Sequence, residues 1–120
     1  MARTRASAKQ AGARMERQVA DYLRDELGNP AIDRMVKSGS YDRGDVGNVR
    51  DSHGRLIAVE VKNTAKMSLP AWTREAAVEA ENYGAHVGVV VSKRHGVGNP
   101  GQQWVHMTLD DLIALLKETP

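Results

Sequence analysis

Residues 55–63 read Arg-Leu-Ile-Ala-Val-Glu-Val-Lys-Asn and form the clearest strand pattern of the chain. Successive side chains of a strand point to opposite faces of its sheet. One face here is apolar, with Ile57, Val59 and Val61, and the other carries Glu60 and Lys62. A carboxylate and an ammonium that face a covering layer are costly if they are dry and unpaired. The strand therefore predicts an open, polar cleft on its charged face.

The segment before this strand predicts a hairpin. Residues 51–54, Asp-Ser-His-Gly, have Asp at the first and Gly at the last position of a turn, and residues 41–50 are predicted as the preceding strand. In a symmetric four-residue loop, Arg50 pairs with Arg55 and Asp45 lies directly opposite Glu60, with their Cβ atoms about 5 Å apart. A bulge would shift this register by one residue and turn Asp45 to the other face.

Two opposed carboxylates and a nearby lysine predict hydrolytic chemistry. Asp45 and Glu60 repel each other at this distance unless a cation or a proton lies between them. Hard oxygen ligands suit Mg²⁺, with Mn²⁺ as a substitute. Lys62 lies on the same face as Glu60, where its ammonium can orient an attacking water and offset charge that develops on a phosphate. We therefore predict that Asp45, Glu60 and Lys62 form a metal-dependent site for phosphodiester hydrolysis.

The first predicted helix carries a further acid. Residues 6–27 place apolar side chains on one helix face, and Gly28-Asn29-Pro30 ends the pattern. Glu16 lies on this apolar stripe, and a buried acid needs a partner. Two interpretations remain open: Glu16 reaches the metal or its water, or it forms an ion pair with Arg14, Arg17 or another basic residue.

The remaining segments predict a single α/β domain over residues 1–120, with residues 1–6 as a flexible basic tail. The element order is α-β-β-β-α-β-β-α, which implies a mixed β-sheet flanked by helices. The continuous apolar run in residues 85–92 predicts a central strand covered on both faces. The predicted strands are 32–37, 41–50, 55–63, 85–92 and 104–107, and the helices are 6–27, about 70–83 and a last one capped by Thr108.

Composition and charge narrow the function classes. The chain has no Cys, which excludes disulfides and thiolate metal sites, and no apolar run approaches the roughly 20 residues of a membrane span. We therefore expect an intracellular, cytoplasmic protein without a membrane partner. Its net charge is only +2, but basic residues gather in the first twenty positions and in the glycine-rich loop 93–103. We expect them to contact DNA phosphates, the alternative being a solvated tail and loop. The predicted DNA-binding residues are Arg3, Arg5, Lys9, Arg14, Arg17, Lys93 and Arg94.

Taken together, Glu16, the pair Gly44-Asp45 and the run Glu60-Val61-Lys62 resemble the PD-(D/E)xK nuclease superfamily. The resemblance covers residues 10–92 and is greatest to archaeal-type Holliday junction resolvases. It implies a restriction-endonuclease-like fold, with Asp45, Glu60 and the Val61 carbonyl as metal ligands and Glu16 as an additional acid. It implies that Lys62 positions the attacking water, and that Ser40, with Ser38 as a rival, lies near the scissile phosphate. Gly44 stands where the superfamily has proline.

The resemblance implies a Mg²⁺-dependent endonuclease that cuts branched DNA, above all four-way junctions, in recombination and repair. A resolvase cuts two strands, so a homodimer is expected. One alternative is another nuclease of this superfamily, acting in replication, repair or restriction. A second alternative is a DNA-binding or assembly module without catalysis, in which Asp45, Glu60 and Lys62 form only a salt-bridge network. The loop 93–103 lacks the Gly-Lys-Ser/Thr of a phosphate-binding loop, so no nucleotide cofactor is expected.

Overall fold

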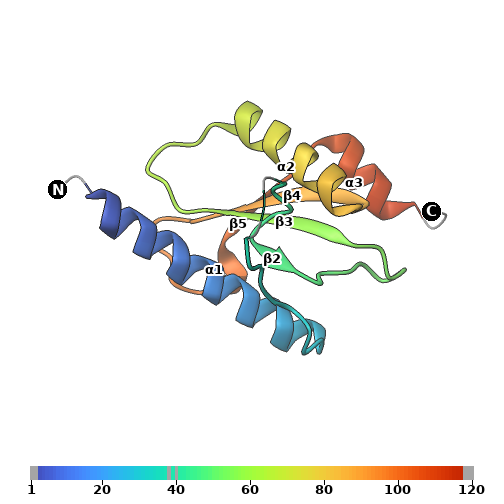
Figure 1. Ribbon diagram of the computed structural model, residues 1–120, viewed down its shortest axis with the longest axis horizontal. Coiled ribbons are helices and arrows are strands. Elements are labelled where there is room, and N and C mark those ends of the chain that lie inside the picture. Colours follow the sequence, from blue (N-terminus) through green and yellow to red (C-terminus); the bar gives the residue numbers. More distant parts are fainter. Residues whose placement is uncertain (1–2, 38, 40, 118–120) are drawn as a thin grey trace.

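A computed structural model describes residues 3–37, 39 and 41–117 of the protein, in which helices pack on a β-sheet to form an α/β fold (Figure 1). Over these residues, five strands form one open sheet in the order β1-β2-β3-β4-β5, in which β3 and β4 run parallel and the other neighbouring strands run antiparallel. The prediction of a mixed sheet flanked by helices is confirmed. In chain order the elements are α1 (Arg5–Leu27), β1 (Asp33–Arg34), β2 (Val46–Gly47), β3 (Ile57–Lys62), α2 (Leu69–Tyr83), β4 (Val87–Ser92), the 3₁₀ turn η1 (Pro100–Gln102), β5 (Trp104–His106) and α3 (Leu109–Leu116).

Helix α1 is delimited by its two caps. The Thr4 side chain accepts a hydrogen bond from the Ser7 N–H, and Gly28 closes the helix with a left-handed φ of 63°. The helix therefore begins within the segment that was predicted as a flexible tail. Across the part of the chain that the structure describes, none of the helices is both long and apolar enough to span a membrane.

Two helices cover opposite faces of the sheet, with α1 on one side and α2 on the other (Figure 1). The α1 side holds the larger core, to which β3 contributes Ile57, Val59 and Val61. The α2 side holds a smaller core of Trp72, Ala76 and Val90. The predicted alternation of β3 is therefore confirmed, and Glu60 and Lys62 share the face of α2. All six residues of β4 are buried, which confirms its prediction as a central strand.

The hairpin before β3 differs from the prediction at its turn. Arg50 pairs with Leu56 rather than with Arg55, so the predicted pairing is wrong there. The reason is that Asp51 closes the turn: its N–H donates to the Arg55 carbonyl, and its carboxylate accepts from the N–H groups of His53 and Arg55. Between this pair and the next, the first strand contains one residue more than β3, and this extra residue cancels the shift of the turn. Val46 therefore pairs with Val59, as the predicted register requires.

Strands β1 and β2 are shorter than predicted, because the backbone bends on both sides of β2. Asn48 has a φ of +66° and Gly44 a φ of +100°, neither of which continues a strand. At Gly44 the chain also runs close to β3, because a Cβ atom there would lie 2.9 Å from the Val59 carbonyl oxygen. The conformation of Gly44 therefore places the backbone of the next residue, Asp45, against β3.

Helix α2 packs directly on the backbone of β4. A Cβ atom at Gly88 would lie 2.2 Å from the Ala76 carbonyl oxygen, so only glycine permits this approach. Ala76 lies between Glu75 and Glu79 on the helix, and β4 is the parallel neighbour of β3. The contact therefore holds the acidic turn of α2 close to the strand that carries Glu60.

Candidate metal centre

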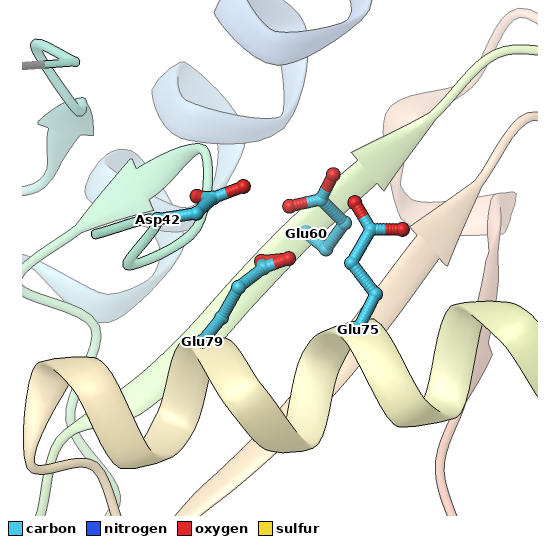
Figure 2. Close-up of side chains that lie close together, drawn as sticks. All are labelled: Asp42, Glu60, Glu75 and Glu79. Carbon is cyan, nitrogen blue, oxygen red and sulfur yellow. The ribbon is translucent and has the colours of Figure 1, made fainter. Parts of the chain in front are cut away.

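Four carboxylates from three elements converge on the α2 face of the sheet (Figure 2). Asp42 comes from the loop before β2, Glu60 from β3, and Glu75 and Glu79 from successive turns of α2. Each offers an oxygen atom, and these oxygens all lie within 4.8 Å of one another. We call these four residues the acidic cluster. Such a set of oxygen ligands could hold a metal ion.

The two inner members of the acidic cluster are deeply buried. Glu79 is 1% exposed and Glu60 is 5% exposed. Apart from a proton that the two carboxyl groups can share, no described residue donates a hydrogen bond to Glu60 Oε2 or to either carboxylate oxygen of Glu79. Burial of unpaired carboxylates is unfavourable unless a proton or a cation compensates them.

The electrostatics of the pair follow from this burial. Desolvation raises the pKa of Glu60 to about 10, helped by a hydrogen bond with Glu79 and by the charge of Asp45. Desolvation likewise raises the pKa of Glu79 to about 7, although the same hydrogen bond lowers it. Without a cation, the two side chains therefore share a proton near neutral pH. This proton lies between the Glu60 and Glu79 carboxyl groups, where the surrounding acids favour a positive charge.

Asp45 lies beside the acidic cluster but is not one of its four members. Its backbone N–H donates to the Val59 carbonyl, and its Oδ2 accepts from the Val61 N–H at 2.8 Å. Its Oδ1 lies 2.7 Å from Lys37 Nζ. The charge of Asp45 still raises the pKa of Glu60 and of Glu79. Asp45 and Glu60 therefore share one electrostatic site, and the role of Asp45 as a metal ligand stays a prediction.

Lys62 lies at the edge of the acidic cluster, on the same face as Glu60. Its Nζ is 3.5 Å from Glu60 Oε1 and 3.0 Å from Glu75 Oε2. Burial lowers the pKa of Lys62, but the hydrogen bond and charge of Glu75 together with Glu60 outweigh it, so the pKa lies above its ordinary value. Lys62 is therefore a cation that the neighbouring acids hold in place.

The other predicted site residues lie elsewhere or outside the description. Glu16 is not in the acidic cluster: its Oε1 pairs with Arg34 Nη2 at 3.1 Å, the ion-pair alternative left open by the sequence. Val61 is buried next to Asp45 and Glu60. Ser38 and Ser40, the two candidates for the loop serine, lie outside the described residues.

Some of the basic residues predicted to contact DNA gather beside Lys62, at the carboxyl ends of β3 and β4. Arg3 donates to the Asn63 carbonyl at 2.8 Å, and the backbone N–H of Lys93 donates to the Lys62 carbonyl. The Arg94 guanidinium stacks 4.5 Å from the centroid of the Trp104 ring.

The remaining predicted DNA-binding residues lie along α1. Arg5, Lys9 and Arg14 are exposed there. Arg17 is exposed as well, but it pairs with Asp21 and Asp33. Any contact of these residues with DNA stays a prediction.

Comparison with protein-family models, curated proteins and solved structures finds no match for this chain. The functional interpretation therefore depends on the residues themselves.

Asp42, Glu75 and Glu79 were not among the predicted site residues. A signal for Glu79 was present: it lies seven residues after Trp72 and next to Ala80, on the apolar face of its helix. An acid on an apolar helix stripe was the criterion that selected Glu16. Asp42 lies between Tyr41 and Arg43 in a loop and carries no comparable pattern, whereas Glu75, three residues after Trp72 and next to Ala76, carries a weaker form of the same signal.

Proposed function

We propose that this chain is a divalent-metal-dependent DNA endonuclease with Mg²⁺ as its cofactor. The observation that carries the proposal is the set of buried carboxylate oxygens of Glu60 and Glu79 that lack donors and lie beside Lys62 and Asp45. A metal-free structural role would favour apolar or fully paired side chains at these depths. Their placement supports a site built for added positive charge.

The donor set fits a hard divalent cation. Every candidate ligand is a carboxylate or carbonyl oxygen, the preference of Mg²⁺ and Mn²⁺. The site gathers five carboxyl groups (Asp42, Asp45, Glu60, Glu75 and Glu79) against two lysines, Lys37 and Lys62. This excess of acid over base supports binding of a cation with a double charge.

In the proposed reaction, each residue has a separate task. The carboxylates of the site would hold the cation, which would supply activation of water, polarisation of the phosphate and neutralisation of the leaving oxygen. Glu60 supplies a negative oxygen on the central strand. Lys62, held by Glu75 and Glu60, orients the attacking water and offsets charge on the phosphate. Asp45, anchored to the Val61 N–H, keeps its charge next to Glu60.

The proposal also covers how DNA is held. The Arg3 guanidinium donates to the carbonyl of Asn63, directly after β3, so its charge lies near the end of that strand. Lys93 is joined to Lys62 through its backbone N–H, while its ammonium donates to the Val97 carbonyl of its own loop. Phosphates are the groups that basic side chains contact, and the contacts set position rather than sequence preference. Arg94 is held by stacking on Trp104, which leaves a charged, ordered group on the same loop.

By resemblance, we propose a restriction-endonuclease-like fold within the PD-(D/E)xK superfamily. We propose four-way DNA junctions as the substrate, a homodimer as the active form and the cytoplasm as the location. A homodimer places two such sites on one junction, which symmetric cutting of two strands requires. Sedimentation of the protein with and without junction DNA measures the state of assembly.

The deciding experiment compares junction, flap, duplex and single-stranded DNA, with Mg²⁺ and with chelator. We expect Mg²⁺-dependent cutting that is fastest on junctions. Asp45→Asn should lose cutting but keep DNA binding, because an amide oxygen can still accept from the Val61 N–H while the charge is gone. Asp25→Asn, an exposed position on α1, is the matched control and should cut normally. Equal cutting of all substrates would remove the resolvase assignment and leave the nuclease.

A second candidate function has its own supporting observation. Lys62 already pairs with Glu75 and Glu60, and Asp45 with Lys37, which are the contacts expected of a structural salt-bridge network. Such a chain would be a DNA-binding or assembly module. It would bind DNA equally well with Mg²⁺, with chelator and with Asp45→Asn, and it would cut none of the substrates.

A further inference from the structure

We infer that the cation of this protein binds on the α2 side of β3, with Glu79 and Glu60 as inner ligands and Asp42 and Glu75 as outer ligands. This ligand set differs from the one implied by the resemblance, which used Asp45, Glu60, the Val61 carbonyl and Glu16. The inference rests on the proposed function for its catalytic meaning. Binding of the cation can be measured without DNA.

Glu79 supplies an observation independent of the clustering itself. Its side chain is 1% exposed, and both of its carboxylate oxygens lack a donor from the other described residues. It points from the buried face of α2 toward Glu60 (Figure 2). A helix position packed against the sheet ordinarily holds an apolar residue, as Trp72 and Ala76 do on the same face. An acid there needs a positive partner, and no described lysine or arginine pairs with it.

The alternative inner ligands are already occupied. One oxygen of Asp45 accepts from the Val61 N–H, and the other lies against Lys37. Glu16 Oε1 pairs with Arg34. Among the described residues, the buried carboxylate oxygens without a hydrogen-bond donor at this place are Glu60 Oε2, both oxygens of Glu79 and Asp45 Oδ1, and the last of these is already neutralised by the Lys37 ammonium at 2.7 Å.

The spacing of the four oxygens suits a hexacoordinate cation. Two ligands on opposite sides of Mg²⁺ are about 4.2 Å apart, and around Ca²⁺ about 5 Å apart. One oxygen of each residue in the acidic cluster lies within 4.8 Å of the others, a range that includes the separation required around Mg²⁺ or Mn²⁺. Asp42 is exposed and the Glu75 side chain is 39% exposed, so these two can move inward.

The two more exposed members of the acidic cluster also provide the route by which a cation can enter it from solvent. Glu60 and Glu79 form the buried floor of the acidic cluster, and Asp42 and Glu75 form its open rim. Water can complete the coordination shell at the rim, as Mg²⁺ prefers. The rim is also where Lys62 contacts Glu75, so a substrate phosphate at this edge would meet the cation and the ammonium together.

The test is direct titration of Mn²⁺ into the metal-free protein, followed by the electron paramagnetic resonance signal of free Mn²⁺. Glu79→Gln keeps the shape of the side chain and removes its charge, and we expect its affinity for Mn²⁺ to fall by at least tenfold. Glu81→Gln, exposed on the same helix, is the control and should bind as the unchanged protein does. Asp45→Asn should retain Mn²⁺ binding within a few fold, because Asp45 is outside the ligand set.

Opposite results would overturn the inference. If Asp45→Asn abolishes Mn²⁺ binding and Glu79→Gln does not, the cation binds on the Asp45 side. Glu75→Gln provides a second check, because it removes a charge at a partly exposed position without changing the shape of the side chain, and it should weaken Mn²⁺ binding several-fold. Failure of the proposed function looks different: the protein then binds Mn²⁺ in a Glu79-dependent way and cuts no DNA. Cutting that persists in a Glu79→Gln variant with unchanged Mn²⁺ affinity would reject this site and spare the nuclease.

Discussion

Glu79→Gln should stabilise the metal-free protein at alkaline pH, although it removes a ligand. In the folded protein the pKa of Glu79 is raised by burial to about 7, whereas the ordinary value is 4.5. Between these two values the folded state holds more protons than the unfolded state, so stability falls as pH rises through this window. Glu60 continues the loss at higher pH, because its pKa is raised further, to about 10.

The size of the effect follows from the shift. One pKa unit corresponds to about 1.4 kcal/mol, so complete ionisation of Glu79 costs the folded state about 3 kcal/mol at most. Glutamine carries no charge, and its amide can form a hydrogen bond with the Glu60 carboxyl group in place of the shared proton. We therefore expect Glu79→Gln to be more stable than the unchanged protein by about 2 kcal/mol near pH 8, and about equal near pH 5.

Urea unfolding in the presence of chelator measures both proteins at each pH. Glu81→Gln should follow the unchanged protein, because its side chain is exposed. The reasoning fails if the unchanged protein has the same unfolding free energy near pH 5 and pH 8 and Glu79→Gln is the less stable of the two. Such a result would mean that Glu79 has a favourable charged partner, not an unfavourable buried charge.

Three further substitutions probe the backbone and the lysine. Gly44→Ala should lower the unfolding free energy by about 2 kcal/mol, because φ is +100° and the added methyl would meet the Val59 carbonyl; unchanged urea midpoints would contradict this. Lys62→Met should slow DNA cutting by about a hundredfold or more while leaving Mn²⁺ binding intact, and equal cutting rates would exclude its role at the phosphate. Gly88→Ala should lower the unfolding free energy by about 3 kcal/mol, because the added Cβ would overlap the Ala76 carbonyl. Circular dichroism during urea unfolding measures this change, and an unchanged unfolding free energy would contradict the close contact between α2 and β4.

The sequence predicts the elements well where their patterns are strong. The alternation of residues 55–63 and the valine run of residues 85–92 place β3 and β4, because a period of two is typical of a half-buried strand and a short, valine-rich apolar run of a central one. Caps and breakers placed the helix ends within a residue or so, as at Gly28 and Gly84. These signals are local, so they can be interpreted without knowledge of the partner elements.

The hairpin and the acidic cluster were harder to predict, because they depend on backbone detail and tertiary packing. A symmetric turn was the simplest assumption at Asp51, but the hydrogen bonds that its carboxylate accepts from the His53 and Arg55 N–H groups moved the pairing of Arg50 by one residue. The meeting of Asp42 with Glu79 depends on how α2 crosses the sheet, which no local pattern encodes. Glu60 could be identified from the sequence because the alternation of apolar and polar residues along β3 shows to which face of the sheet its side chain points.

The glycine contact between α2 and β4 divides the acidic cluster into a rigid half and an adjustable half. Main chain touches main chain at Gly88, so the height of the helix above the sheet cannot change by a different choice of rotamer. The backbones of Glu79 and Glu60 keep a constant separation as a result, and the more exposed side chains of Asp42 and Glu75 have the greatest freedom to accommodate ions of different radius. Discrimination between small and large cations is therefore most readily altered at positions 42 and 75.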